Sequence, residues 1–303
     1  MPPSEPKEPV AGFPLKFKWL TGDWERIFDE QIKLVRADIQ RARLDGKIVV
    51  YLSCPVSARG GGHAGTNVDI AKFTERRLLR EWGERFWVLN PAQYQLESKE
   101  GYGLLDIHAK ALKIDLAALL KKDKPDLPAG GDYMRMWTKV LVEDAPASSQ
   151  LPVAKPRNLG GSFDAYYFLG PTDVRAFFGV DSSVSLGASI EEYFARKHSF
   201  DRAFRDNFSV EPAAGQLSDA EKAAWDAQRR AFLVYYSLRA SVTVSLGSHD
   251  EWAIFNLLNQ ARRKVPEIDG GGIPNQIAGF FDGRALPISS GEAAASLGYA
   301  VPT

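Results

Sequence analysis

The sequence predicts an α/β protein with a doubly wound parallel sheet, and two observations lead to this fold class. Short runs of β-branched and aromatic residues alternate along the chain with longer segments of helical periodicity. Strands and helices that alternate in this way pair in parallel and place helices on both faces of the sheet. The first run, Lys47 to Ser53, also lacks polar alternation until its end, as expected for a strand covered on both faces. We therefore expect a five-stranded parallel sheet with helices on both faces and long helical insertions.

The first half of the chain is expected to hold two of these strands. Apolar residues recur at helical spacing from Trp24 to Leu44, and Thr66 and Asn67 are good helix N-caps after the first strand. The expected elements are a helix over 22–44, a strand over 47–53, a helix over 68–82, a strand over 85–89 and a helix over 132–143.

The second half continues the alternation. The expected elements are a strand over 164–169, a helix that starts near Glu191 and runs to about 197, a helix over 218–238, a strand over 240–246, a helix over 250–263 and a strand over 276–281. Three polar connecting segments, 99–131, 145–161 and 200–216, are long enough to be insertions in a core domain. No internal repeat is evident, so residues 21–303 are expected to form one elaborated domain.

Composition and charge restrict the partners and cofactors. The 303 residues are 45% hydrophobic, which is enough for one large core or two modest ones, and the formal net charge is zero. A neutral chain does not capture nucleic acid or an anionic membrane broadly, so we expect neither partner. The single cysteine, Cys54, excludes an intrachain disulfide, and the four histidines are not spaced as zinc ligands. We expect no metal and no other cofactor.

The N-terminal residues 1–20 are rich in proline and are expected to form a flexible leader. They lack the basic and then apolar pattern of a signal peptide, and no run of about 18 apolar residues occurs in the chain. Together with the single cysteine, this predicts a reducing, cytoplasmic setting.

The loop after the first strand is a candidate phosphate site. In an open parallel sheet, ligands bind beyond the carboxyl ends of the strands. The loop there combines hydroxyls, a guanidinium and a glycine run whose amides can approach a ligand closely. Its candidate binding residues are Ser53, Ser57, Arg59, Gly60, Gly61 and Gly62. The alternative is that the glycines only turn the chain into the next helix.

Glu191 is the candidate catalytic residue. It follows Ser185-Leu186-Gly187 near the start of a helix, beyond the strand over 164–169. A carboxylate in this place could attack an anomeric carbon as an oxocarbenium-like centre forms, provided that a second group protonates the departing base. The alternative is that a glutamate in a first helical turn only interacts favourably with the helix dipole. Glu192 competes with Glu191 for the same role.

A second acidic group follows the strand expected over 240–246. Ser248-His249-Asp250-Glu251 opens the next helix and so lies at the ligand-binding edge of the sheet. This group could contact a ligand or complete the site of a neighbouring subunit. The simpler interpretation is that Asp250 is a first-turn acid and His249 a loop residue.

Together, several of these segments resemble the nucleoside 2-deoxyribosyltransferase superfamily, and most closely its nucleoside 5′-monophosphate N-glycosidase branch. The resemblance is carried by four segments, which are Val50 to Gly61, Tyr133-Met134-Arg135, Phe163 to Leu169, and Ser185-Leu186-Gly187 with Glu191. It implies a flavodoxin-like sheet, a dimer or higher homo-oligomer, no metal, and a glutamate that forms a glycosyl-enzyme intermediate.

The resemblance also implies roles for individual residues. Glu191 would be the nucleophile, assisted by Ser185 and Gly187, and Tyr51 falls where the family often has an aromatic residue. The 5′-phosphate would lie on Ser57, Arg59, Gly60 and Gly61, although this loop is roughly two residues longer than expected. The family's helix aspartate is replaced here by Met136 or Trp137, and Asp132 is the acid that could substitute for it.

We therefore expect a hydrolase or transferase that acts on the N-glycosidic bond of a small-molecule nucleotide or nucleoside. Two alternatives stay open. The same scaffold could cleave a dinucleotide such as NAD, or it could be a nucleotide-binding module without catalysis, which the missing aspartate would favour.

Overall fold

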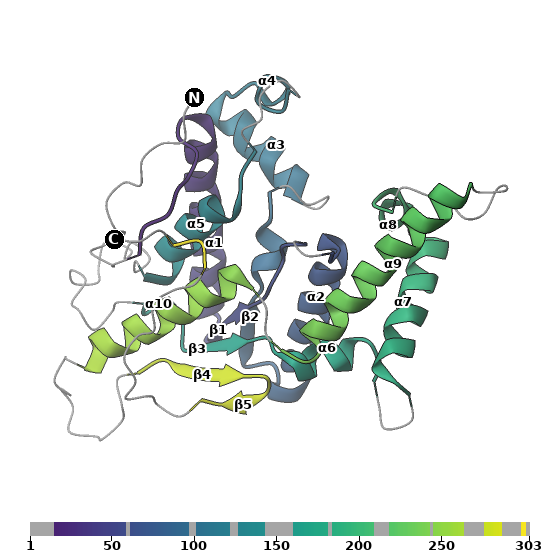
Figure 1. Ribbon diagram of the computed structural model, residues 1–303. Coiled ribbons are helices and arrows are strands. Elements are labelled where there is room, and N and C mark those ends of the chain that lie inside the picture. The colour runs from purple at the N-terminus through teal and green to yellow at the C-terminus, as the bar shows by residue number, and fades with distance from the viewer. Residues whose placement is uncertain are drawn as a thin grey trace.

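The protein is an α/β structure built on one five-stranded sheet (Figure 1). The computed structural model describes residues 15–58, 61–96, 101–121, 127–142, 160–180, 184–208, 218–242, 245–263, 276–286 and 298–300. The strands are β1 (Ile48–Ser53), β2 (Phe86–Leu89), β3 (Ala165–Phe168), β4 (Ala278–Phe281) and β5 (Arg284–Ala285), in the order β2-β1-β3-β4-β5. The pairs β1·β2, β1·β3 and β3·β4 are parallel, and β4·β5 is antiparallel.

The expected sheet of five parallel strands is wrong in two respects. The fifth strand is β5, which returns from β4 through a tight turn at Asp282 and Gly283 and is therefore antiparallel. The strand expected over 240–246 is also wrong. In its described part the chain leaves the preceding helix through a turn, with the Val242 N–H bonded to the Leu238 carbonyl at 2.7 Å, and a helix begins at Leu246. The sheet position beside β3 is filled by β4 instead.

Alternation along β1 assigns the two faces of the sheet. Val49 and Tyr51 belong to one buried cluster, whereas Val50 and Leu52 belong to the other. Successive side chains of a strand point to opposite faces, so a strand that is apolar throughout needs cover on both sides.

Helices supply this cover. The first cluster includes side chains of α1 (Asp23–Leu44), α5 (Gly130–Val142) and α10 (Leu246–Arg263). The second includes side chains of α2 (Ala64–Trp82), α6 (Pro171–Phe177), α7 (Leu186–Phe200), α8 (Arg202–Asp206) and α9 (Asp219–Arg239). The remaining elements are η2 (Pro91–Tyr94), α3 (Gly101–Leu112) and α4 (Leu116–Leu119). The helices expected from the sequence are thus present, with α3, α4 and α8 inside the segments interpreted as insertions.

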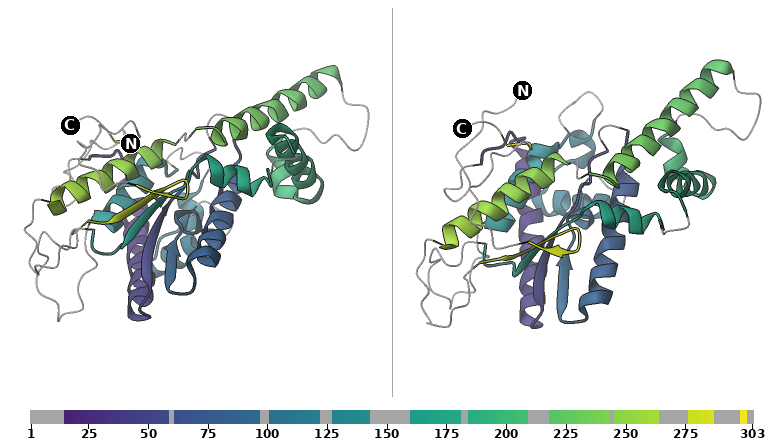
Figure 2. Two further views of the ribbon diagram at one scale, coloured as in Figure 1. Left: turned by 90° about the horizontal axis from the view of Figure 1, so that it is seen from below. Right: turned by 60° about the horizontal axis from the view of Figure 1, so that its bottom comes forward.

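Helices α7 and α9 form an arm beside the sheet. Both views of Figure 2 show α9 extending away from the strands, with α7 alongside it. Aromatic side chains fill the interior of the arm, where the Phe194 and Phe232 rings lie 5.1 Å apart.

The leader expected over 1–20 is not free along its whole length. Leu15 is the first described residue, Phe17 is 2% exposed, and the Leu20 N–H bonds to Asp132 at 2.6 Å. Residues 15–20 are therefore packed against the first cluster, and residues 1–14 lie outside the described part of the chain. Among the described residues, no helix combines the length and apolar character needed to cross a bilayer.

Candidate active site

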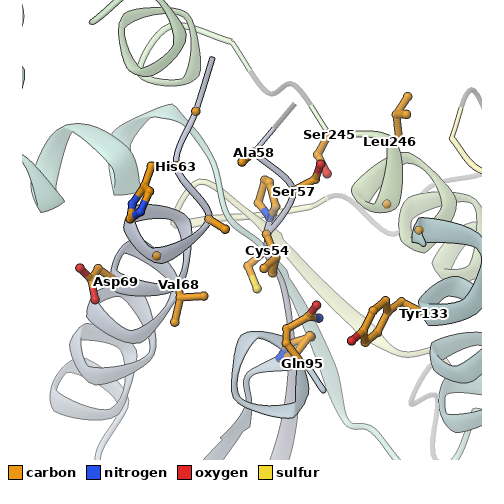
Figure 3. Close-up of a pocket in the computed structure, with 18 of the residues that line it drawn as sticks. Cys54, Ser57, Ala58, His63, Val68, Asp69, Gln95, Tyr133, Ser245 and Leu246 are labelled. Carbon is orange, nitrogen blue, oxygen red and sulfur yellow. The ribbon is translucent and has the colours of Figure 1, made fainter. Parts of the chain in front are cut away.

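A cavity of about 1010 Å³ opens at the carboxyl end of β1. Figure 3 shows Cys54 within it, with His63 from the start of α2 on one side and Tyr133 from α5 on the other. The remaining walls come from the loop after β1, from α8 and α9, and from the first turns of α10. The lining residues used below are Cys54, Val56, Ser57, Gly62, Tyr133, Trp137, Lys197, Tyr235, Ser245, Gly247, Glu251 and Tyr299.

Glu251 is the buried carboxyl group of this cavity. It is 4% exposed, and both of its oxygens accept hydrogen bonds from hydroxyl groups at the end of β1. The Tyr51 hydroxyl donates to Oε1 at 2.7 Å, and the Ser53 hydroxyl donates to Oε2. Two O–H donors orient the carboxyl group and favour its ionised form.

Simple periodicities bring these three residues together. Tyr51 and Ser53 are two residues apart on β1, so both side chains face the same side of the sheet. On α10, Glu251 shares a stripe with the core residues Ile254, Phe255 and Leu258, which follow at helical spacing. Burying that stripe against the sheet places Glu251, one turn earlier, at the carboxyl end of β1.

Burial sets the acidity of Glu251. Its desolvation raises the pKa of Glu251 from an ordinary 4.5 to about 7, while the hydrogen bonds from Ser53 and Tyr51 oppose the rise and the charge of Asp250 adds to it. A carboxyl group with a pKa near neutrality can exchange protons or act as a carboxylate at physiological pH. Burial and the Glu251 charge also raise the pKa of the Cys54 thiol, so this cysteine is protonated and a poor nucleophile.

The adjacent acid, Asp250, has a structural role. Its carboxylate accepts the Tyr299 N–H at 2.7 Å and the Ala300 N–H at 3.2 Å. This contact holds the segment 298–300 against α10, and Tyr299 from that segment lines the cavity. Consecutive residues of one helix point in different directions, which separates the two carboxyl groups.

The loop expected to bind phosphate does border the cavity. Ser57 and Gly62 line it, whereas Arg59 and Gly60 lie outside the described residues. The Asn67 side-chain amide donates to the Ser57 carbonyl at 2.9 Å, and the Tyr235 hydroxyl donates to the same oxygen at 3.2 Å. The described part of the loop is thus held by α2 and α9.

Packing explains part of the glycine run. A Cβ atom on Gly62 would lie 2.5 Å from the Tyr235 ring, and one on Gly61 would lie 3.0 Å from the Ala231 Cβ. Gly61 also has a positive φ of 102°, a conformation that favours glycine. Both glycines are therefore required by the close approach of α9, independently of any ligand.

Glu191 lies elsewhere. It belongs to α7, its side chain is 47% exposed, and it forms an ion pair with Arg229 of α9. Neither Glu191 nor the exposed Glu192 lines the cavity. Helix α6 intervenes between β3 and α7, so the segment at Ser185 is one helix away from the strand end.

Ser185 and Gly187 accordingly have a local role. The Ser185 hydroxyl caps α7 by accepting the Ala188 N–H at 3.3 Å, and neither residue lines the cavity. The structure therefore does not bring Ser185, Gly187 and Glu191 to the loop that was expected to bind phosphate.

Asp132 is engaged at the start of α5. Its Oδ1 accepts the Leu20 N–H at 2.6 Å, and its Oδ2 accepts the Ala129 N–H at 2.8 Å. Burial raises the pKa of Asp132, and these two hydrogen bonds oppose the rise. Asp132 does not line the cavity, but Trp137, at one of the positions where an aspartate was expected, does.

Glu251 belongs to the group after 240–246 that was expected to be able to contact a ligand, but it was not selected as a catalytic candidate, although a second signal was present. The pattern Ser-Leu-Gly followed four residues later by Glu occurs twice, as Ser185-Leu186-Gly187 with Glu191 and as Ser245-Leu246-Gly247 with Glu251. Only the second copy lies at the cavity, where Ser245, Gly247 and Glu251 all contribute to the lining.

Within the described part of the chain, no three His, Cys, Asp or Glu side chains are grouped so that they could hold a metal ion.

No family model, curated protein or solved structure matches the chain. The resemblance to the nucleoside 2-deoxyribosyltransferase superfamily thus stays a prediction, carried by short motifs.

Proposed function

We propose that this protein cleaves or exchanges the N-glycosidic bond of a nucleotide or nucleoside, with Glu251 as the nucleophile in place of Glu191. One observation carries the proposal. A buried glutamate faces a large strand-end cavity and accepts hydrogen bonds from Tyr51 and Ser53. Glu251 also has the motif spacing that the family resemblance requires of its catalytic glutamate.

The reaction would proceed in two steps. The Glu251 carboxylate attacks the anomeric carbon, the C–N bond breaks, and the base leaves with the bonding electron pair and takes up a proton from bulk water. Water or an acceptor base then attacks the same carbon and loses a proton to bulk water, and the glycosyl ester bond breaks to regenerate the carboxylate. During both steps Tyr51 and Ser53 orient the carboxyl group through their hydroxyls.

The aromatic lining of the cavity suits a nucleobase. Tyr133, Trp137 and Tyr299 all border the space that Glu251 faces. Aromatic side chains offer flat apolar surfaces against which a base can stack. The strand order β2-β1-β3-β4 is also the order of flavodoxin-like, doubly wound sheets, and it supports that arrangement for the parallel part of this sheet.

The size of the cavity favours a second candidate substrate. Its volume of about 1010 Å³ is at the upper end of the range for sites that take drug-sized ligands, about 300–1,000 Å³. A dinucleotide such as NAD would use more of this space than a single nucleoside.

The homodimer and the cytoplasmic setting expected from the sequence remain predictions, and light scattering in solution would measure the oligomeric state.

Released base provides the test. The full chain is incubated with a panel of nucleosides, nucleoside monophosphates and NAD, and the products are separated by chromatography. For an accepted substrate, Glu251→Gln should lower kcat by at least about 1,000-fold because it removes the nucleophile. Glu191→Gln is the matched control from the other copy of the motif. Its kcat should stay within about threefold of wild type, because Glu191 does not line the cavity and its ion-pair partner Arg229 lies on the helical arm.

The outcomes separate the alternatives. Loss of turnover in Glu191→Gln but not in Glu251→Gln would return the role to Glu191. Nucleotide binding without released base from any substrate would favour the non-catalytic module. Mass spectrometry of the rapidly quenched enzyme should find the glycosyl adduct on the peptide that contains Glu251.

A further inference from the structure

Tyr299 closes one end of the aromatic wall of the cavity. Gly130, Tyr133 and Trp137 follow one another at helical spacing on α5, and all three line the cavity. The segment 298–300 lies across the start of this helix, between α5 and α10, where Figure 1 shows it as a short yellow piece of chain. Its Tyr299 ring lies against Gly130 and also lines the cavity. The ring therefore extends the wall formed by Tyr133 and Trp137.

Two glycines make room for this segment. A Cβ atom on Gly130 would lie 2.1 Å from Cζ of the Tyr299 ring, and one on Gly298 would lie 2.2 Å from the Leu246 carbonyl oxygen. Neither glycine has a φ in the left-handed region, so the backbone conformation does not require glycine at either position. The close approach of the segment does. The fit between the segment and the two helices is therefore specific to this docked position.

Asp250 holds the segment in place. It is 0% exposed, and its two carboxylate oxygens accept the N–H groups of Tyr299 and Ala300 at 2.7 and 3.2 Å. A buried carboxylate needs such donors, and hydrogen bonds to a charged acceptor are stronger than those between neutral groups. Since Asp250 directly precedes Glu251 on α10, the segment is fixed to the part of the helix that carries the buried acid of the cavity.

The start of α5 is held against the ring from the other side. A Cβ atom on Gly131 would lie 2.1 Å from the Lys18 carbonyl oxygen, and the Leu20 N–H bonds to Asp132 at 2.6 Å. The chain before α1 and the segment with Tyr299 thus hold the first turn of α5 between them. A ligand that extended past the end of the wall would have to displace Tyr299 itself.

We propose that Tyr299 determines specificity by size: its ring limits how far a flat group can extend along the wall beside Glu251, and Asp250 keeps the ring in that position. Bulky substituents at the far end of such a group are excluded. That the flat group is a nucleobase rests on the proposed function, whereas the size limit itself requires no catalysis. Tyr299 acts by its place in the cavity and takes no part in proton or glycosyl transfer.

Cys54 provides a reporter that is independent of turnover. It is the single cysteine of the chain and lines the same cavity, so thiol labelling of the full protein reports access to this space. Two methanethiosulfonates are compared, one that transfers a methylthio group and one that transfers a bulky dansylamidoethylthio group, and each releases methanesulfinate. Burial raises the pKa of the Cys54 thiol and slows both reactions alike. The ratio of the two rate constants, bulky over methyl, therefore measures the size limit.

The proposal predicts this ratio in wild type and in three variants. Relative to the same pair of reagents on the urea-unfolded chain, the ratio in folded wild type should be at least about tenfold lower, because a closely packed wall does not yield to a bulky group. Tyr299→Ala leaves space at the end of the wall and should raise the ratio at least about tenfold. Asp250→Ala releases the segment and should raise the ratio in the same way. Tyr299→Phe keeps the ring and should keep the wild-type ratio.

Asp282→Ala is the matched control. The Asp282 carboxylate also accepts a backbone N–H, that of Thr172 at 2.7 Å, but it does not line the cavity, so the ratio should not change. Labelling through unfolding would raise the ratio in this control too. An unchanged ratio in Tyr299→Ala would overturn the proposal, as would an equal rise in the control. If neither Tyr299→Ala nor Asp250→Ala folds, wild type decides: a ratio equal to that of the unfolded chain would overturn the proposal.

The size limit should also appear in turnover. For an accepted substrate, an analogue carries a bulky group on the edge of the base that lies away from the glycosidic nitrogen. Its kcat/KM relative to that of the parent substrate should rise at least about tenfold in Tyr299→Ala. Unaltered selectivity would overturn the proposal. Size-selective labelling of Cys54 without released base from any substrate would overturn the proposed function alone.

Discussion

The Tyr51 hydroxyl donates a hydrogen bond of 2.7 Å to Glu251 Oε1 and thereby joins the end of β1 to the first turns of α10. Each residue is nearly inaccessible to solvent, and they are separated by 200 positions in the chain. Because the bond is made to a carboxylate oxygen, it favours the ionised form of Glu251.

Removing this hydroxyl should make Glu251 less acidic. In Tyr51→Phe the pKa of Glu251 should rise above its value of about 7, because one donor to the carboxylate is lost. The acidic limb of the pH profile of kcat/KM should move to higher pH, with a loss of about tenfold at pH 6 and a smaller loss at pH 8.

Tyr166→Phe is the matched control for this change. Tyr166 is the register partner of Tyr51 on β3, and its buried hydroxyl has no hydrogen-bond partner among the described residues. The control should leave the pH profile unaltered. Identical profiles for Tyr51→Phe and wild type would show that the hydrogen bond does not influence the reactive carboxyl group.

The elevated pKa of Glu251 also predicts how stability depends on pH. Between about pH 4.5 and 7 the folded protein binds the Glu251 proton more tightly than the unfolded chain does. The stabilisation that this provides is complete below about pH 4.5 and is lost as the pH rises through about 7. Relative to Glu251→Gln, the free energy of unfolding of wild type should fall by about 3 kcal/mol across this interval. Urea unfolding at pH 4.5 and pH 7.5 measures the difference, and parallel pH dependences of the two proteins would contradict it.

The contact between Gly62 and Tyr235 is suited to a double-mutant cycle. Gly62→Ala places a Cβ against the Tyr235 ring and should destabilise the protein by about 1–3 kcal/mol. In a Tyr235→Ala background the same substitution should cost less than about 1 kcal/mol, because the obstructing ring is gone. Thermal and urea unfolding of the four proteins provide the cycle. An equal cost in both backgrounds would mean that the glycine is required for another reason.

Asp132 should matter for stability and not for turnover. Asp132→Ala leaves the N–H groups of Leu20 and Ala129 without their acceptor, which should destabilise the protein by about 1–2 kcal/mol. The kcat of the folded variant should stay within about threefold of wild type, because the carboxyl group does not line the cavity. A loss of several hundredfold in kcat, with unfolding unchanged, would restore the catalytic role expected from the sequence.

Local patterns were sufficient to predict much of the architecture. The apolar run at the start of β1 predicted a strand covered on both faces, and the spacing of Trp24, Ile27 and Phe28 predicted the buried face of α1. The valine-rich stretch after α9 predicted a strand that its described residues do not form. Strand propensity alone provides no pairing partner, and β4 is the strand that pairs with β3 on the side away from β1. The position of the loop after β1 at the edge of the cavity was also predictable, since this loop follows a parallel strand.

The sequence by itself contains Ser-Leu-Gly with a glutamate four residues later twice. It predicted the helix that carries Glu191 after the first copy, whereas Ser245 and Leu246 of the second copy were expected in a strand. Only the tertiary structure decided which copy faces the cavity. Glu251 precedes a stripe of Ile254, Phe255 and Leu258 that is buried against the sheet, so α10 carries it to the end of β1. In α7 the apolar residues after Glu191 are buried in the arm with α9, and Glu191 pairs with Arg229. The motifs are equivalent locally, and the long-range burial of the helices that carry them makes only one of them a candidate site.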